Sequence, residues 1–244
     1  YSSHFGINVN SWQLDQRARR AAYASNPDTL PLLARRSSRE ATAIGNNLFT
    51  MGYHAAGFDF GFTRIVDYRT EVRDTRDIVA DVEAFVATPR RSPFFLYVAL
   101  NAPHHPYVPP NEFLRQVRDA SGVRLDPEVR RYLGEVAYTD DAVGRIARAL
   151  EREGLAANTV LIVTADHGEG LREDNAYTNV VFERPSRFTH TVNLYDEVVR
   201  IPLVFVGAGV AKGLRVGTQV RLLDITQTVA EIMTGRASPK QAGS

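Results

Sequence analysis

Thr159–Glu169, with the sequence TVLIVTADHGE, is a short apolar run rich in β-branched residues that ends abruptly in a carboxylate and an imidazole. The run predicts a buried strand with Asp166 and His167 directly after its carboxyl end. In open α/β sheets, ligands bind just beyond the carboxyl ends of the strands. Carboxylate oxygen and imidazole nitrogen both bind divalent cations, so the pair is a candidate metal site. An Asp-His pair can also cap a helix or close a turn, so the prediction depends on the strand before it and on Gly168 and Glu169 after it.

The composition is that of an ordinary globular protein. The chain has 244 residues, of which 44% are hydrophobic and 23% are charged, and this length fits one large domain or slightly more. The formal net charge of +1 gives no field that would attract nucleic acid or an anionic membrane. No apolar run approaches the roughly 18 residues of a membrane helix, and the absence of cysteine excludes disulfides. Of the 29 basic residues only Lys212 and Lys240 are lysine, so a catalytic lysine has few possible sources.

The order of the expected elements is that of an α/β protein. Strands are expected at 42–49, 94–100, 159–164 and 201–206, helices at 74–87, 128–152 and 224–233, and a polar loop at about 172–189. The long helix repeats apolar residues at its own period, namely Val129, Leu133, Val136, Val143, Ala147 and Leu150. Asp140 lies on that stripe, where a buried carboxylate needs a hydrogen-bond partner. Asp224 is the expected cap of the last helix and Gly235 its end. Alternating strands and helices imply an α/β fold with a largely parallel sheet sandwiched by helices.

Side chains that can bind metal or transfer protons gather in three loops beside predicted strands. The first loop contains His104 and His105, the second contains Asp166, His167 and Glu169, and the third contains His190. A lone histidine in a loop is usually a surface residue. Three clusters at one edge of a sheet are expected to meet, because that edge is where sites form. Histidines in such a place bind metal, hydrogen-bond an anionic ester or protonate a leaving group.

Several segments, in order along the chain, resemble the sulfatase family of the alkaline phosphatase superfamily. The similar segments are APHHPY (102–107), YTDDAVG (138–144), TADHGE (164–169), the block from His190 to Leu203, and LDITQT (223–228). The resemblance runs from about Thr29 to Gly235. It implies an alkaline-phosphatase/sulfatase-like fold and a metal-dependent hydrolase of sulfuric or phosphoric esters.

Carried over residue by residue, the resemblance assigns roles to the loop residues. Asp166 and His167 would bind one divalent metal ion, Ca²⁺ first and Mn²⁺, Mg²⁺ or Zn²⁺ otherwise, which would lower the pKa of the nucleophile. His104 and His190 would be catalytic and contact the ester or its leaving oxygen. Glu169 would hydrogen-bond His167 from behind, although a catalytic duty stays open. Asp140 is assigned, from the helical stripe, a similar supporting or capping hydrogen bond.

The chain also departs from the family's pattern. The family's nucleophile lies in a Cys/Ser/Thr-x-Pro-x-Arg motif, and residues 25–33 contain only near misses without the arginine, so the nucleophile stays unknown. Ile44-Gly45-Asn46-Asn47 stands where many sulfatases have Gly-Lys-Trp-His, which favours the phosphoester branch. We therefore expect residues 1–235 to be a sulfatase-like catalytic domain lacking its N-terminal portion, followed by a tail at 236–244. The 244-residue chain alone would then be incomplete and inactive, and the missing N-terminal segment would be a partner.

Three functions remain open at this stage. The first is hydrolysis of sulfuric esters, and the second is phosphoryl-headgroup transfer or phosphodiester hydrolysis within the same superfamily. The third is a non-catalytic fragment or pseudoenzyme module that binds a partner. The expected substrate is a small-molecule, saccharide or lipid ester rather than nucleic acid, and the resemblance favours a periplasmic or secreted location.

Overall fold

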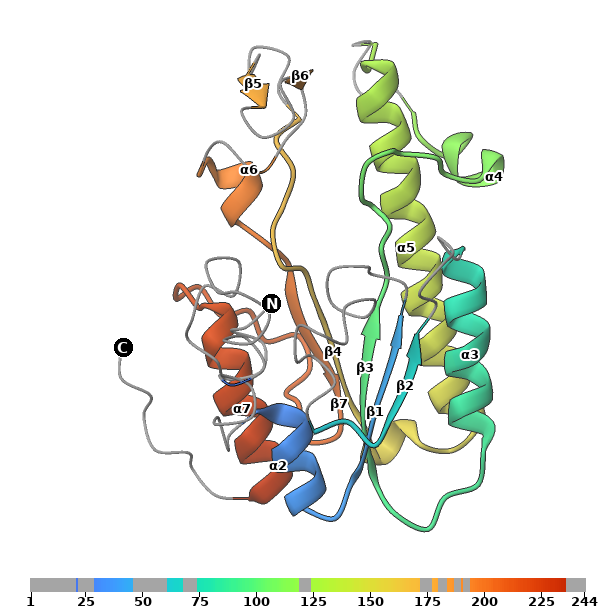
Figure 1. The fold of residues 1–244 in the computed structure, drawn as a ribbon, viewed down its shortest axis with the longest axis vertical. Coiled ribbons are helices and arrows are strands. Elements are labelled where there is room, and N and C mark those ends of the chain that lie inside the picture. The colour runs from blue at the N-terminus through green and yellow to red at the C-terminus, as the bar shows by residue number, and fades with distance from the viewer. Residues whose placement is uncertain are drawn as a thin grey trace.

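The computed structural model describes residues 21, 29–45, 61–67, 74–118, 124–171, 177–179, 184–186, 190 and 194–235. Its strands are β1 (Glu40–Gly45), β2 (Arg64–Asp67), β3 (Phe94–Ala99), β4 (Val160–Thr164), β5 (Tyr177–Asn179), β6 (Arg184–Ser186) and β7 (Leu203–Gly207). Its helices are α2 (Leu30–Arg36), α3 (Thr75–Ala87), α4 (Asn111–Leu114), α5 (Pro127–Arg152), α6 (Asp196–Val199) and α7 (Leu222–Thr234), with a 3-10 turn at Ala156–Asn158. The predicted α/β fold is confirmed, with helices on both sides of the strands (Figure 1).

The central strands run parallel. β1 pairs with β2 on one side and with β3 on the other, in the order β2-β1-β3. Their carboxyl ends point to the top of Figure 1, and the chain after β3 continues upward there toward α4. β4 pairs with β7 instead, and this pair is antiparallel. Among the described residues no ladder of hydrogen bonds joins β3 to β4.

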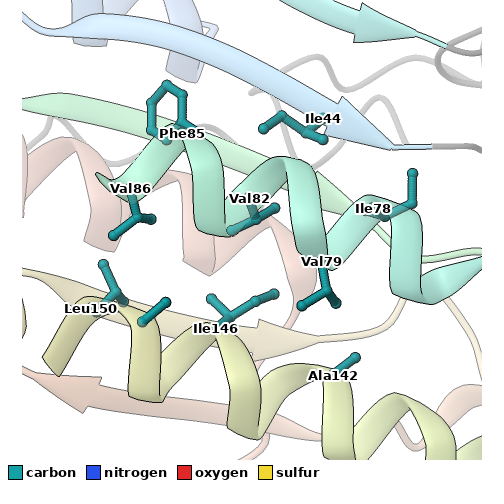
Figure 2. Close-up of a cluster of buried hydrophobic side chains, with 10 residues drawn as sticks. Ile44, Ile78, Val79, Val82, Phe85, Val86, Ala142, Ile146 and Leu150 are labelled. Carbon is teal, nitrogen blue, oxygen red and sulfur yellow. The ribbon is translucent and has the colours of Figure 1, made fainter. Parts of the chain in front are cut away.

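The two faces of the strands carry separate apolar cores because successive side chains of a strand point to opposite faces. Ile44 faces α3 and α5, where it packs in the cluster of Figure 2; the other buried members are Ile78, Val79, Val82, Phe85, Val86, Ala142, Ile146, Ala149 and Leu150. Its neighbour Ala43 faces α2 and α7, where the cluster contains Leu30, Ala99, Ile225 and Val229. Ile162 of β4 and Leu203 of β7 pack on this second cluster. Packing thus places β4 beside the parallel strands, although the two sheets share no ladder.

Local sequence explains where the main helices begin and end. α3 begins after Asp74 and α5 after Asp126, and each of these carboxylates accepts a backbone N–H two residues on, as N-cap residues do. Gly235 ends α7 in the left-handed conformation, with φ 66°, as predicted. The predicted cap of α7 is wrong by one turn. Arg221 is its N-cap, and Asp224 stands three residues on and accepts the Arg221 N–H at 2.7 Å.

Several boundaries differ from the sequence predictions. The strand predicted at 42–49 is β1, which starts two residues earlier, and residues 46–49 lie outside the described residues. The polar loop predicted at 172–189 contains the short antiparallel pair of β5 and β6. β2 and α2 had not been predicted, because each is short and has little hydrophobic periodicity. None of the helices in the described part of the chain has the length and apolar character of a bilayer-spanning segment.

Candidate active site

β4 delivers the acidic and imidazole side chains to the carboxyl-end edge of the sheet, as its sequence predicts. Asp166 and His167 follow the strand after one residue. The Asp166 Oδ1 atom accepts the His167 backbone N–H at 3.0 Å, and the Oδ2 atom lies 3.6 Å from His167 Nε2. Both side chains are partly exposed, so a ligand can reach them. The two functional atoms therefore face one another at the edge of the strand.

The tautomer of His167 follows from its neighbour. Its Nδ1 atom lies 2.8 Å from the carbonyl oxygen of Gly168. A carbonyl only accepts hydrogen bonds, so we assign the proton to Nδ1. In the neutral ring, the lone pair is then on Nε2, the atom that faces Asp166. Metal-binding histidines usually donate their other ring N–H to a carbonyl or carboxylate in this way.

Gly168 connects this loop to α6. Its N–H donates to the carbonyl oxygen of Val198 at 2.7 Å. A Cβ atom on Gly168 would lie 2.0 Å from the carbonyl oxygen of Glu197, a distance that no side chain tolerates. Only glycine allows α6 to approach the Asp-His segment this closely. Gly168 therefore fixes the position of the loop that carries Asp166 and His167.

The structure brings the other two histidine loops to the same place. The ring of His190 stacks on that of His167 with centroids 3.7 Å apart and planes 21° apart. The ring of His104 lies 6.4 Å from that of His190. His105 is exposed, and its carbonyl oxygen lies 2.6 Å from His104 Nδ1. The predicted meeting of three loops is thus confirmed in geometry, whereas the chemical roles of these residues stay predictions.

Glu169 is the buried acid of the cluster, and its partner differs from the one expected. It is 8% exposed, and its Oε1 atom lies 3.2 Å from Nδ1 of His190 rather than bonding to His167. Its Oε2 atom accepts the Tyr107 hydroxyl at 2.9 Å. Burial alone would raise the pKa of Glu169, but the hydrogen bonds from His190 and Tyr107 lower it overall. The prediction that Glu169 supports His167 is therefore wrong in its partner, because the stacked His190 takes that position.

Tyr107 completes this network from the histidine loop. It is buried, and burial together with the charge of Glu169 raises its pKa well above the ordinary value. Its hydroxyl therefore keeps its proton and remains a donor to the carboxylate at any working pH. Glu169 is thus held from two sides, by Tyr107 and by His190. The carboxylate acceptor identifies Nδ1 of His190 as the protonated nitrogen, which leaves Nε2 for other contacts.

α5 supports the histidine loop from behind, a role that the sequence analysis missed. Glu135 is buried at 7% exposure, and its Oε1 atom accepts the Val108 N–H at 2.8 Å. Gly134 lies so close to the loop that a Cβ atom there would be 2.8 Å from Cγ of Pro109. Burial raises the pKa of Glu135, which the hydrogen bond from Val108 only partly offsets. A carboxylate one helical turn from the aromatic Tyr138 on the buried face was the signal that could have found it.

Asp140 does not lie on the buried stripe of α5, so that part of its prediction is wrong. Asp140 is exposed, and so is Val136, which the sequence analysis placed on the same stripe. The buried face is formed by Gly134, Glu135, Tyr138, Ala142, Ile146, Ala149 and Leu150, and the small Ala142 and Ala149 pack with Ile146 and Leu150 in the cluster shared with α3. The supporting role of Asp140 near the metal site stays untested.

The described residues supply only part of a metal site. Within the described part of the chain, no group of three or more His, Asp or Glu side chains has the arrangement of a metal site. Asp166 and His167 nevertheless form a donor set of one hard oxygen and one imidazole nitrogen, which suits a divalent cation. The residues therefore fit such an ion as two of its ligands.

Comparisons with known proteins give one consistent family. A family model described as Sulfatase matches residues 8–235. The choline-sulfatase of Rhizobium meliloti (strain 1021) is 25% identical over 177 residues, which are 58% of this chain and 32% of that protein. The match to the family model thus includes all of the described residues.

Solved structures agree with the fold. A Bacteroides thetaiotaomicron protein from a locus for the metabolism of multiple glycosaminoglycans superposes with a TM-score of 0.68 at 17% identity, covering 96% of this chain and 58% of that one. The lipoteichoic acid synthase LtaP from Listeria monocytogenes superposes with a TM-score of 0.67 at 17% identity, covering 97% of this chain and 60% of that one. The chain spans less than two thirds of each of these three proteins.

Proposed function

Because the chain belongs to the sulfatase family, we propose that it forms the metal- and ester-binding part of a catalytic domain that hydrolyses sulfuric esters. One observation carries the proposal. The rings of His167 and His190 stack at 3.7 Å beside Asp166, so side chains that are able to bind metal and to transfer protons lie at one edge of the sheet. The family match supports the reaction class, and this juxtaposition supports the residues.

We propose that Asp166 and His167 hold a divalent cation. The oxygen and nitrogen atoms lie 3.6 Å apart, a separation at which both can contact one ion. The Gly168 carbonyl fixes the ring of His167 so that Nε2 is the available donor. When bound, the ion would supply Lewis acidity and a lowered pKa for the nucleophile. The family resemblance favours Ca²⁺, and the imidazole ligand equally suits Mn²⁺, Mg²⁺ or Zn²⁺.

His190 and His104 would act on the ester itself. Glu169 holds His190 through Nδ1, so Nε2 is the atom that can meet an ester oxygen. His104 enters from the neighbouring loop, with its ring 6.4 Å from that of His190. In its imidazolium form each ring could donate through Nε2 to a substrate oxygen between them, because the carboxylate and carbonyl partners already take the Nδ1 protons. Stabilising charge and protonating the leaving oxygen are each worth about 10²–10⁴-fold in rate in known enzymes.

The phosphoester reading is the second candidate, and a specific observation supports it. The fold superposes as well on a lipoteichoic acid synthase as on a protein of glycosaminoglycan metabolism. The sequence at 44–47 also lacks the Lys and His that many sulfatases have there. A phosphoryl-headgroup transferase or phosphodiesterase would use the same metal ligands, Asp166 and His167, and the same catalytic histidines. A module that binds a partner without catalysis is the remaining alternative.

Turnover of three aryl esters by the whole protein, with added metal and with a chelator, tests these candidates. We expect metal-dependent hydrolysis of 4-nitrophenyl sulfate that Asp166→Asn and His190→Gln each reduce at least about 100-fold. Asp166→Asn should also lower the bound metal content, whereas His190→Gln should not. Asp141→Asn is a matched control on an exposed residue and should change neither.

Each other outcome points elsewhere. Faster turnover of a bis-aryl phosphodiester or an aryl phosphate would establish the phosphoester reading. Metal bound without turnover of any ester would favour the non-catalytic module. Equal metal content in wild-type and Asp166→Asn protein would show that the metal site was wrongly assigned.

A further inference from the structure

An open cavity lies at the end of the parallel strands that is opposite to the candidate active site. It has a volume of about 580 Å³ and is lined by the amino ends of β1 and β2, the segment that leads into β3, and the residues after α2 and α3. Four arginines line it, namely Arg39, Arg64, Arg90 and Arg91. Small-molecule sites typically have volumes of about 300–1,000 Å³. The cavity is therefore large enough for a ligand, and no residue of the candidate active site lines it.

Arg90 is the deepest of the four and has a structural role. Its guanidinium stacks on the ring of Phe85 at 3.7 Å, lies 5.2 Å from that of Phe94, and donates through Nη2 to the Phe85 carbonyl at the end of α3. Its side chain is 12% exposed. The Nε and Nη1 atoms have no hydrogen-bond partner among the described residues, although Glu40 lies 3.6 Å from Nε. A buried charge with unpaired donors commonly marks the place of an ion or water.

The positive charge around Arg90 exceeds the negative charge. Glu40 is the one carboxylate among the residues that line the cavity. Arg39 donates to the carbonyl oxygens of Ser37 and Met233, which are neutral acceptors, and no carboxylate among the described residues forms an ion pair with it. Arg64 and Arg91 are exposed, and neither side chain forms an ion pair or hydrogen bond with another described residue. Burial lowers the pKa of Arg90, and the negative charge of Glu40 partly offsets this decrease. The positive charge of Arg64 lowers the pKa of Arg90 further, which indicates that Arg64 lies near enough to repel the Arg90 guanidinium.

The chemistry of the lining suits tetrahedral oxyanions. Guanidinium groups present several N–H donors in a fixed plane that matches sulfate and phosphate oxygens. The hydroxyls of Ser38 and Ser92 also line the cavity, and both residues are exposed and can donate further hydrogen bonds. A single inorganic ion would fill only part of 580 Å³. The ligand that fits best is an organic body that carries at least one oxyanion group.

We propose that the cavity lined by Arg39, Arg64, Arg90 and Arg91 is a second binding site, separate from the candidate active site, for a small molecule bearing a sulfate or phosphate group. Arg64 and Arg91 are the entry groups, because they are exposed and their side chains have no ion pair with a described residue. Arg90 supplies the buried charge that an anion would compensate. The proposal is independent of which ester the active site hydrolyses.

Calorimetry with glucose 6-sulfate, glucose 6-phosphate and glucose tests the site. The titrations use the whole protein at constant ionic strength with a chelator present, so that metal-dependent binding at the active site is removed. Hydrogen exchange measured in the same solutions locates the binding. We expect at least one of the two anionic sugars to bind and to protect residues 37–41, 62–66 and 88–93.

A double variant of the entry arginines tests the assignment. Arg64→Gln/Arg91→Gln should weaken this binding at least about tenfold, with an unchanged unfolding temperature because both residues are exposed. Arg131→Gln/Arg215→Gln removes the same charge from exposed positions outside the cavity and should leave binding within about twofold. Tighter binding of the sulfate or of the phosphate would each support the site and assign its ligand class.

Three results would overturn the proposal. The first is binding of neither anionic sugar above the level of glucose. The second is protection confined to the loop at 102–109 that carries His104. The third is equal weakening by the cavity variant and the control variant, which would indicate only a general charge effect.

Discussion

Gly168 gives the most direct test of the site's architecture, because a single methyl group decides it. In Gly168→Ala the added Cβ would lie 2.0 Å from the Glu197 carbonyl oxygen, 3.0 Å from the Glu197 carbonyl carbon and 3.4 Å from the Val198 Cα. All three contacts are with backbone, so no side-chain rotation relieves them. α6 must move away, and that motion breaks the hydrogen bond from the Gly168 N–H to the Val198 oxygen.

The expected loss follows from two contributions. Overpacking of this kind costs about 1–3 kcal/mol, and loss of the hydrogen bond costs about 0.5–1.5 kcal/mol. Replacing glycine restricts the unfolded chain and returns roughly 0.4–1 kcal/mol. The net loss of unfolding free energy is about 0.5–4 kcal/mol. For a domain of this size, each kcal/mol lowers the unfolding temperature by about 2–4 °C.

Thermal and urea unfolding of the variant, read beside ester hydrolysis, measures both consequences. Displacement of the adjacent His167 should reduce kcat/KM even at temperatures where the variant is fully folded. Gly217→Ala is the matched control, because a Cβ there has no heavy atom within 4 Å, and it should be neutral or slightly stabilising. An unfolding temperature for Gly168→Ala equal to that of Gly217→Ala would refute the close approach of α6.

The supporting contacts give two more tests. Burial raises the pKa of Glu135 above its ordinary value of 4.5. Between these two pKa values the folded protein keeps a proton that the unfolded chain releases. The free energy of unfolding should therefore fall as the pH rises from about 4.5 through the raised pKa. Glu135→Gln keeps an acceptor for the Val108 N–H without the buried charge. In urea unfolding, the free energy of unfolding of the variant should therefore increase relative to that of the wild type from pH 5 to pH 8. Unfolding free energies that change in parallel with pH in the two proteins would contradict this. Tyr107→Phe removes a hydrogen bond to the Glu169 carboxylate and should cost about 1.5–3 kcal/mol in urea unfolding. A free energy of unfolding for Tyr107→Phe equal to that of the wild type would argue against the buried network.

The parts of the fold that follow from short-range pattern could be predicted from the sequence. The β4 segment and the helix at 74–87 agree with the structure almost to the residue, because an uninterrupted β-branched run and a helical apolar period are local signals. The meeting of His104, His167 and His190 was also predictable. It needed only the rule that ligand sites form at the carboxyl ends of strands in open α/β sheets.

The contacts that hold these histidines could not be predicted, because they depend on distances between distant segments. Glu169 could have bonded to either neighbouring imidazole, and the stack of His190 on His167 decides in favour of His190. The buried face of α5 was misplaced because hydrophobicity favoured Val136, whereas close packing against α3 favours small residues such as Ala142. The antiparallel course of β7 is likewise set by chain topology rather than by its apolar sequence.

The architecture of the candidate site depends on buried polar contacts more than on the partly exposed groups that we propose do the chemistry. Glu169 receives one hydrogen bond from the loop of Tyr107 and lies against Nδ1 of His190 in another loop, so its carboxylate fixes two loops at once. Gly168, the residue before it, fixes the third segment to α6. Buried polar networks of this kind behave as units, so losing one member leaves the others unsatisfied. The effects of substitutions at Tyr107, Glu169 and His190 should therefore not add, and a single loss will already displace the ring that stacks on His167.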